Sequence, residues 1–401
     1  MNVRITPSVA RGGISAPPSK SCAHRLLISA ALSDGESVIR NIDLNEDIKA
    51  TIGCLGQMGA TISIEDKVAY VKGIGASSRK DSLSLFCNES GSTLRFLIPL
   101  SLVFSRKVEF TGRGRLMARP QSVYENLLTE KGCSFMKEDD ALVVEGDLGS
   151  GIYELEGNVS SQFITGLLFT LPLLQGDSRI VLTTELQSAP YIDITIDVLS
   201  RFGIKISTEE NGYFINGNQK YTSGEFTCEG DWSNGAFLDA FNMAGGQVTV
   251  TGLSDDSYQG DKAYREFYEK LNEGFCELDI TQCPDLGPVV FACAAIKKGA
   301  LIRGTDRLKI KESDRALAMA EELKKLGVNI ELGCNQVIIP DAELKAPREV
   351  LRCHNDHRIA MSLAVICSIT GGELEGAECV SKSYPEFFND IEKLGITYKN
   401  V

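Results

Sequence analysis

Apolar residues recur at helical spacing in several segments that end in glycine and lead into a short β-rich run. The six glycines are Gly59, Gly132, Gly203, Gly274, Gly327 and Gly395. Glycine just after a helix adopts the left-handed capping conformation without the penalty that a Cβ atom brings. The pattern therefore predicts six helix ends, each followed by a strand. Coincidence is the alternative, because helices that end in Leu-x-x-x-Gly are common.

The spacing of these glycines indicates an internal repeat. Successive glycines are 73, 71, 71, 53 and 68 residues apart. In four cases a polar turn and a second β-rich run follow, and these runs begin at Val68, Ala141, Gly212 and Gln336. We interpret the chain as six α/β units of ~70 residues in two lobes of three, since one such unit is too small to bury a core alone.

Composition narrows the class of protein. The chain has 401 residues, of which 43% are hydrophobic and 24% charged, and its net charge is −13. These values exclude a largely disordered chain, a collagen and a coiled coil. An acidic chain is a poor general nucleic-acid binder, so no nucleic-acid partner is expected, although a local basic pocket for a small anion remains compatible.

The termini and the cysteines predict a cytoplasmic protein. Residues Met1–Gly13 contain no apolar core of a signal peptide, and the longest apolar runs, Phe163–Leu174 and Ile359–Ile369, fall short of the roughly 20 residues that span a membrane. Twelve cysteines occur without a C-x-x-C pair, which indicates reduced thiols. With only three histidines, no metal site is expected.

Small polar residues and cations precede several apolar helices. Such starts occur at Pro18–Arg25, Asn88–Arg95, Ser160–Phe163 and Ser188–Tyr191. Free N–H groups and the helix dipole favour anions there. Hydroxyl and amide groups at these starts would also suit a polyhydroxylated ligand. Each start alone is also typical of an ordinary helix cap.

Three further segments concentrate charge. Residues 106–119 carry five basic side chains and one acid, which suits a mobile loop that closes on phosphate or carboxylate. In Arg303–Arg315, Lys311 and Arg315 would share a face if the segment opened a helix. In Asn355–Arg358, an Asp or Asn cap precedes an arginine that the helix dipole disfavours, so this arginine points to an anion. Solvated charge runs are the alternative.

Taken in order, these motifs resemble the 5-enolpyruvylshikimate-3-phosphate synthases, a branch of the enolpyruvyl transferase family. The resemblance rests on Lys20-Ser21…Arg25, Ser160-Ser161-Gln162, Lys311–Arg315 and Asp356-His357-Arg358, and it spans Lys20 to Lys382. It implies transfer of the enolpyruvyl group of phosphoenolpyruvate to the 5-hydroxyl of shikimate 3-phosphate, through a tetrahedral intermediate and with release of phosphate. It implies a monomer with no cofactor.

The resemblance also implies an α/β fold of two lobes, each with three βαβαββ repeats, as in an inside-out α/β barrel. Residues 1–14 plus 228–401 would form a discontinuous lobe on the phosphoenolpyruvate and catalytic side. Residues 15–227 would form the lobe that mainly holds shikimate 3-phosphate, with the active site in the cleft between.

Residue roles follow from the same resemblance. Contacts to shikimate 3-phosphate are implied for Lys20, Ser21, Arg25, Ser160, Ser161, Gln162, Ser188, Tyr191, Asp285 and Lys311. Contacts to phosphoenolpyruvate are implied for Lys20, Gly91, Arg115, Gln162, Arg315, Arg358 and Lys382. Asp285 would take the hydroxyl proton and Glu312 would protonate the methylene carbon. Lys311 and Lys20 would stabilise the developing charge.

Two positions depart from the family pattern. Glu89 stands where many members have asparagine, and Arg307 stands where some have asparagine, so neither receives a role. The alternatives are the sister transferase that acts on UDP-N-acetylglucosamine and a non-catalytic anion-binding relative. The loop Gly112–Pro120 lacks the cysteine of the sister family, and Lys311–Arg315 favours the shikimate branch.

Overall fold

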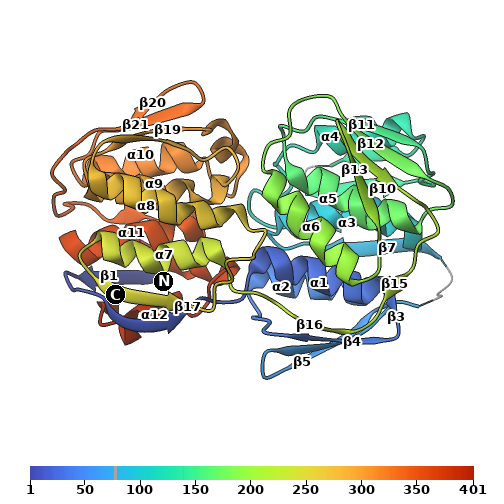
Figure 1. Cartoon of the computed structure of the whole chain (residues 1–401), viewed down its shortest axis with the longest axis horizontal. Helices are drawn as coiled ribbons and strands as arrows, with labels where there is room; N and C mark the ends of the chain where they lie inside the picture. Colours follow the sequence, from blue (N-terminus) through green and yellow to red (C-terminus); the bar gives the residue numbers. More distant parts are fainter. Residues whose placement is uncertain (76–78, 139) are drawn as a thin grey trace. The chain divides into compact units, whose positions relative to one another are not determined.

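A computed structural model describes residues 1–75, 79–138 and 140–401, and they divide into two compact units (Figure 1). The continuous unit is Lys20–Glu229, and the discontinuous unit is Met1–Ser19 with Gly230–Val401. The resemblance placed the boundaries between the two lobes near residues 14 and 228. In the structure the boundaries between the two units lie between residues 19 and 20 and between residues 229 and 230.

The continuous unit contains three four-stranded sheets with one shared topology. In each sheet, the first two strands run parallel to each other. The third and fourth strands each run antiparallel to the strand before them. The first sheet is β16 (Glu225–Thr227), β4 (Glu36–Arg40), β6 (Val68–Lys72) and β5 (Thr61–Glu65). The second is β7 (Lys80–Phe86), β8 (Ser105–Thr111), β10 (Ala141–Glu145) and β9 (Ser134–Lys137). The third is β11 (Ile152–Leu155), β12 (Ser178–Leu182), β14 (Gly212–Ile215) and β13 (Ile206–Glu209). A short pair, β3 (Ser33–Asp34) and β15 (Tyr221–Thr222), adds to them.

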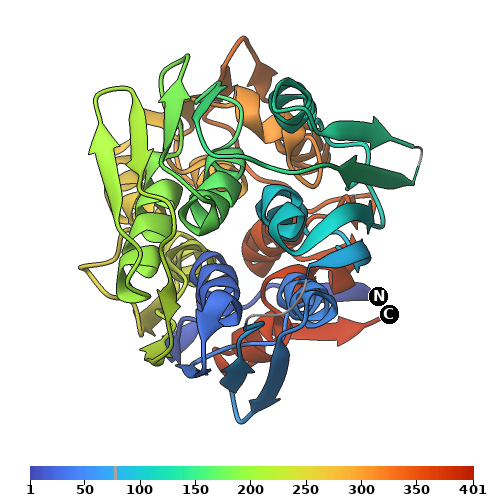
Figure 2. The ribbon, with the colours of Figure 1, turned by 90° about the vertical axis from the view of Figure 1, so that its right-hand side faces the viewer.

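The sheets of this unit surround its helices, as Figure 2 shows. The helices are α1 (Lys20–Leu32), α2 (Glu46–Met58), α3 (Gly91–Phe104), α4 (Ser122–Glu130), α5 (Ser161–Thr170), the 3-10 turn η1 (Leu171–Leu173) and α6 (Ala189–Arg201). Helices α1, α3 and α5 are buried along most of their length. Because most positions around each of these helices are buried, the three helices form the core of the unit.

The discontinuous unit contains two further four-stranded sheets and one pair of strands. The first sheet is β18 (Cys276–Asp279), β19 (Ala300–Arg303), β21 (Gln336–Ile339) and β20 (Glu331–Leu332). The second is β22 (Leu351–Arg352), β23 (Gly372–Glu375), β1 (Asn2–Thr6) and β24 (Thr397–Asn400). The pair is β2 (Arg11–Ser15) and β17 (Gln247–Thr251), which run parallel.

The helices of the discontinuous unit follow the same plan, with α7, α9 and α11 in the core. They are α7 (Trp232–Met243), α8 (Tyr264–Glu273), α9 (Gly287–Ile296), α10 (Arg315–Lys325), α11 (His357–Thr370) and α12 (Phe387–Lys393). The 3-10 turns are η2 (Gly260–Ala263), η3 (Pro284–Leu286), η4 (Asp306–Ile310) and η5 (Ala377–Lys382).

The predicted two-lobe α/β fold is confirmed, with one departure from six equal repeats. All six cap glycines have positive φ, and the four predicted hairpins are present. Gly274 differs, because it leads into β18, which opens the next sheet instead of a hairpin. The module around β2 and β17 therefore ends without a hairpin among the described residues. Gly395 precedes β24, which pairs with β1 from the start of the sequence.

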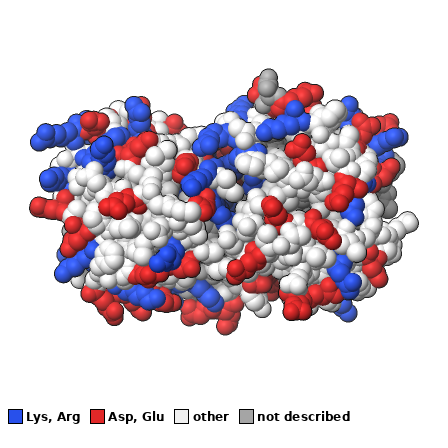
Figure 3. Space-filling view, turned by 90° about the horizontal axis from the view of Figure 1, so that it is seen from above, with Lys and Arg blue, Asp and Glu red and all other residues white. Residues whose placement is uncertain are grey.

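Three further properties concern the surface charge, the apolar helices and the cysteines. On the face shown in Figure 3, acidic and basic side chains are interspersed over each unit. No helix in the described part of the chain is both long and apolar enough to cross a bilayer. All twelve cysteines, which lie within the described ranges, are free thiols.

Candidate active site

Asp285 is the centre of a charged cluster in the discontinuous unit. It lies in η3, just before the buried helix α9. Its Oδ1 lies 2.9 Å from Arg315 Nη1 and 3.1 Å from Lys311 Nζ, and its Oδ2 lies 2.9 Å from Arg358 Nη2. One largely buried carboxylate thus holds three cations from segments far apart in sequence.

Lys311 and Arg315 do not share a helix face, because the condition of that expectation, a helix that includes both residues, is not met. Helix α10 begins only at Arg315, with Asp314 as its N-cap, and Lys311 lies in the extended backbone after η4. Their side chains meet instead at the same oxygen of Asp285. The extended segment before α10 places Lys311 so that both side chains reach one carboxylate.

Arg315 joins three carboxylates. Besides Asp285, its Nε donates to Asp356 Oδ2 at 2.9 Å and its Nη2 donates to Glu312 Oε2 at 2.6 Å. Arg315 is only 1% exposed. Asp356 in turn accepts from the backbone N–H of Arg358 and caps α11, as the sequence predicted. Arg315 therefore orders the two proposed proton-transfer carboxylates and the start of α11.

The cluster shifts the pKa values of its members. Burial alone would raise the pKa of Asp285, but Arg358, Lys311 and Arg315 lower it well below its ordinary value. Burial lowers the pKa of Lys311 to about 8, with Arg315 and Arg307 acting in the same direction and Asp285 opposing them. Asp285 is consequently ionised at neutral pH, and Lys311 titrates close to neutrality.

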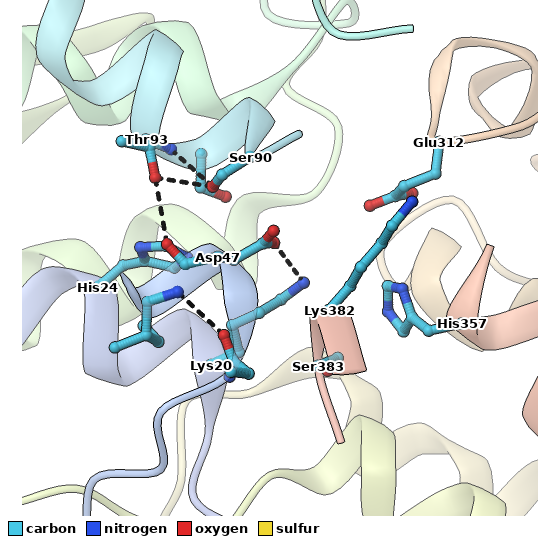
Figure 4. Close-up of polar contacts among 12 residues, drawn as sticks. Lys20, His24, Asp47, Ser90, Thr93, Glu312, His357, Lys382 and Ser383 are labelled. Carbon is cyan, nitrogen blue, oxygen red and sulfur yellow. Dashed lines mark hydrogen bonds and ion pairs between the residues drawn. The ribbon is translucent and has the colours of Figure 1, made fainter. Parts of the chain in front are cut away.

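Lys382 and Glu312 belong to the same unit. Lys382 Nζ donates to the backbone carbonyl of Asn355 at 2.7 Å, directly before Asp356. Figure 4 shows the Lys382 side chain extending toward the carboxylate of Glu312. The structure thus brings the predicted Asp285, Lys311, Glu312, Arg315, Arg358 and Lys382 into one charged region of the discontinuous unit.

A second group of predicted residues gathers at the start of α1. The helix begins at Lys20, whose Nζ lies 2.9 Å from Asp47 Oδ2 (Figure 4). Arg25 donates to the backbone carbonyls of Ser21 and Tyr191 and to Thr195 Oγ1, so it joins α1 to α6. Burial lowers the pKa of Arg25 to about 10, which leaves it charged at neutral pH.

The starts of α3 and α5 converge in the continuous unit. Ser160 caps α5, and Gln162 Nε2 donates to Ser92 Oγ at 3.0 Å. Gln162 Oε1 accepts from Arg95 Nη1 at 2.8 Å. Ser161 begins α5 beside them. Two helix N-termini, an amide and a guanidinium therefore meet, which is an arrangement suited to an anion.

The structure brings Arg119, not Arg115, to this position. Arg115 is exposed in the loop before α4. A Cβ on Gly91 would lie 2.5 Å from Arg119 Nη1 and 3.8 Å from Gln162 Oε1, so the guanidinium of Arg119 occupies the space that glycine leaves. Arg119 is a candidate site residue that the sequence did not predict, although a glycine at a helix start paired with an arginine-rich loop was the available signal.

Ser188 does not cap α6 through its side chain, contrary to the capping interpretation. It precedes the helix in the left-handed region at φ 57, where few non-glycine residues occur. Tyr191, in the first turn of α6, contributes its carbonyl to Arg25.

Glu89 and Arg307, which received no role from the sequence, each contact or influence a nearby group. The carboxylate of Glu89 lies against the backbone of Gly114, where a Cβ would be 2.7 Å from Oε2. Arg307 is buried in η4, and its charge contributes to the lowered pKa of Lys311.

The repeated modules define a two-unit α/β protein whose charged groups suit anionic ligands. Comparisons with known proteins show the family. Residues 6–391 match the model of the family described as EPSP synthase (3-phosphoshikimate 1-carboxyvinyltransferase). The 3-phosphoshikimate 1-carboxyvinyltransferase of Clostridium novyi is 43% identical over 98% of this chain and 97% of its own length. That of Clostridium perfringens strain 13 is 42% identical over 98% of both chains.

The solved structures agree on the fold. An EPSP synthase structure from Acinetobacter baumannii superposes with a TM-score of 0.78 over 99% of both chains at 21% sequence identity. The chain belongs to the EPSP synthase family.

Proposed function

We propose that the chain transfers the enolpyruvyl group of phosphoenolpyruvate to the 5-hydroxyl of shikimate 3-phosphate and releases phosphate. The observation that carries the proposal is the match to the EPSP synthase family along residues 6–391. The cluster of Asp285 with Lys311, Arg315 and Arg358 supports it, because two substrates that repel each other need several cations nearby.

The proposed mechanism uses the carboxylates of the discontinuous unit. Asp285, ionised at neutral pH, accepts the proton of the 5-hydroxyl. At the same time the oxygen of that hydroxyl bonds to C2 of phosphoenolpyruvate. Glu312, held by Arg315 at 2.6 Å, delivers a proton to the C3 methylene. Phosphate then leaves C2, and one proton of the new methyl group returns to the Glu312 carboxylate, which restores the double bond. Lys311 and Lys20 stabilise the charge that develops.

We further propose how the substrates are held. Shikimate 3-phosphate is bound by Lys20, Ser21, Arg25, Ser160, Ser161, Gln162, Ser188, Tyr191, Asp285 and Lys311. Phosphoenolpyruvate is bound by Lys20, Gly91, Gln162, Arg315, Arg358 and Lys382, and by Arg119 in preference to Arg115. The place of Arg119 against Gly91 supports this choice. The free thiols support a reducing compartment, the cytoplasm, and a monomer remains the family expectation.

The decisive experiment measures phosphate release with each substrate omitted in turn. Release that requires both shikimate 3-phosphate and phosphoenolpyruvate supports the proposal. Release with phosphoenolpyruvate and UDP-N-acetylglucosamine instead would assign the chain to the sister activity. Binding of both substrates without any release would indicate a non-catalytic relative.

A further inference from the structure

One buried threonine joins three helices of the continuous unit. Thr195 lies on α6, and both α1 and α5 pack against this helix (Figure 1). Its Oγ1 accepts from Nε of Arg25, on α1, at 2.7 Å and lies 3.1 Å from Oγ1 of Thr165, on α5. The same hydroxyl donates to the carbonyl of Tyr191, one turn earlier in α6, at 2.9 Å. The first turns of these three helices carry groups that are proposed to contact shikimate 3-phosphate.

Thr195 accepts one of three hydrogen bonds that fix the plane of the Arg25 guanidinium. Nε donates to Thr195, Nη1 donates to the carbonyl of Ser21 at 2.7 Å, and Nη2 donates to the carbonyl of Tyr191 at 2.8 Å. Thr195 and Tyr191 are also bonded to each other, so the guanidinium, the hydroxyl and the carbonyl close a ring. A planar guanidinium that is held at all three nitrogens cannot turn without breaking at least one of these bonds.

The contacts of Arg25 leave both charge and donors for a ligand. All three acceptors are uncharged oxygens, and no carboxylate in the described part of the chain forms an ion pair with this side chain. A buried cation without a counter-charge is costly, and burial accordingly lowers the pKa of Arg25 to about 10. A guanidinium has five N–H bonds, so one on Nη1 and one on Nη2 remain. Two neighbouring donors suit two oxygens of a carboxylate or a phosphate.

We propose that Thr195 is a positioning residue whose hydroxyl fixes the guanidinium of Arg25, so that the two remaining Nη–H bonds meet an oxyanion of shikimate 3-phosphate. The inference rests on the proposed function and adds to it a residue that touches no substrate. A side chain that is already ordered loses less conformational entropy when a ligand binds. We therefore expect this hydroxyl to contribute to the affinity for shikimate 3-phosphate and not to the chemical step.

Thr195→Val tests the hydroxyl, because it keeps the branched shape of the side chain. The buried Nε–H of Arg25 would lose its acceptor, and the guanidinium would no longer be fixed. The affinity for shikimate 3-phosphate, measured by calorimetric titration, should fall about 10-fold. The kcat and the KM for phosphoenolpyruvate, measured at saturating shikimate 3-phosphate, should stay within about twofold of wild type. Thr195→Ser, which keeps the hydroxyl, should bind shikimate 3-phosphate like wild type, and a loss equal to that of Thr195→Val would overturn the inference.

Thr170→Val is the matched control. Thr170 is a buried threonine of α5 that donates to the carbonyl of Gly166 at 2.7 Å, one turn earlier, as Thr195 does in α6. The control removes the same kind of bond within a helix but no bond to a cation. It should bind shikimate 3-phosphate like wild type. An equal loss of affinity in Thr170→Val and Thr195→Val would assign the effect to helix packing and overturn the inference.

A double-mutant cycle tests whether Thr195 acts through Arg25. Arg25→Lys removes the Nε donor and the planar fork while it keeps the charge. In kcat/KM for shikimate 3-phosphate, Thr195→Val should lose about 10-fold in the wild-type background but less than about twofold in the Arg25→Lys background. A 10-fold loss in both backgrounds would show that the two residues act independently, which would overturn the inference.

The Nε–H of Arg25 allows a test that needs no variant of Thr195. In ¹⁵N–¹H spectra of the wild-type protein this N–H should be protected from exchange with water, and its absence from the spectrum of Arg25→Lys assigns it. Rapid exchange would overturn the inference, even if Thr195→Val failed to fold. Wild-type protein that does not bind shikimate 3-phosphate would overturn the proposed function, and this inference with it. Wild-type binding together with an unchanged affinity in Thr195→Val would overturn the inference alone.

Discussion

Lys311 and Asp285 form an ion pair in which Nζ lies 3.1 Å from Oδ1. The carboxylate keeps its charge because Arg315 and Arg358 also contact it, while burial brings the pKa of the lysine down to about 8. The pair thus combines a constant negative charge with a positive charge that is lost just above neutral pH.

The first prediction concerns the alkaline side of the pH–rate profile. Lys311 is charged below pH 8 and loses its proton above it, so kcat/KM should fall as pH rises through about 8. In Lys311→Arg the charge persists to much higher pH, and the alkaline fall should move upward or vanish, even if the maximal rate drops. A profile with the same alkaline limb in wild type and Lys311→Arg would assign the titration to another group.

The second prediction is that Asp285→Asn lowers kcat by about 10²- to 10⁴-fold, since the amide cannot accept the hydroxyl proton. The amide oxygen still accepts hydrogen bonds from Arg315 or Arg358, so the variant should fold. Asp279→Asn, at the nearby end of β18, is the control and should turn over normally. Single-turnover measurements check the chemical step, and a wild-type rate in Asp285→Asn would remove this residue from proton transfer.

The third prediction is that Gly91→Ala weakens phosphoenolpyruvate binding without unfolding the protein. The new Cβ would lie 2.5 Å from Nη1 of Arg119, the flexible end of a long side chain that can move aside. Thermal unfolding should change little, whereas KM for phosphoenolpyruvate should rise about 10-fold through displacement of one guanidinium. A large loss of stability at unchanged KM would mean that Arg119 cannot move.

The fourth prediction separates Arg119 from Arg115. Arg119→Lys should raise the KM for phosphoenolpyruvate about 10-fold, because lysine does not reproduce bidentate donation. Arg115→Lys, in the exposed part of the same loop, is the matched control and should stay within twofold of wild type. The reverse order of effects would restore Arg115 to the position that the sequence analysis gave it.

The fifth prediction concerns stability and pH. Burial would raise the pKa of Glu322, but hydrogen bonds from His354, Lys325 and the backbone N–H of Arg352 lower it. A carboxylate with a lowered pKa stabilises the folded state above its unfolded pKa of about 4.3, and this contribution is lost as pH falls through the folded value.

Glu322→Gln should therefore lower the free energy of unfolding by about 3 kcal/mol at pH 7, with a smaller difference below pH 4. Urea unfolding at both pH values measures it. The exposed neighbour Glu321 provides the control, and Glu321→Gln should cost less than about 0.5 kcal/mol. A difference between Glu322→Gln and wild type that is independent of pH would point to packing rather than charge.

Local signals in the sequence predicted the local structure well. The cap glycines, the hairpins after Gly59, Gly132 and Gly203, and the N-caps Ser160 and Asp356 each depend on residues within one or two turns. Ser188 is the exception, because its backbone is left-handed and its side chain makes no capping hydrogen bond.

Contacts between distant segments could not be predicted from spacing. Asp285 and Arg358 are 73 residues apart, and Asp285 does not stand out in its own segment. The meeting of Lys311 and Arg315 at Asp285 depends on a helix that begins at Arg315 and leaves Lys311 in the extended segment before it. The family resemblance named these residues, and only the fold explains what holds them.

The central strand β1 has a consequence for the order of folding. Val3–Thr6 pair with Thr397–Asn400 on one side, and Asn2–Ile5 pair with Gly372–Glu375 on the other. During synthesis these first residues leave the ribosome long before their partners exist, whereas Lys20–Glu229 can fold as soon as it has emerged. Strand β1 is thus made before both of its partner strands and can pair with them only after the continuous unit has been made. A nascent chain stalled before residue 372 should protect the amides of the continuous unit from hydrogen exchange while leaving those of Asn2–Thr6 open.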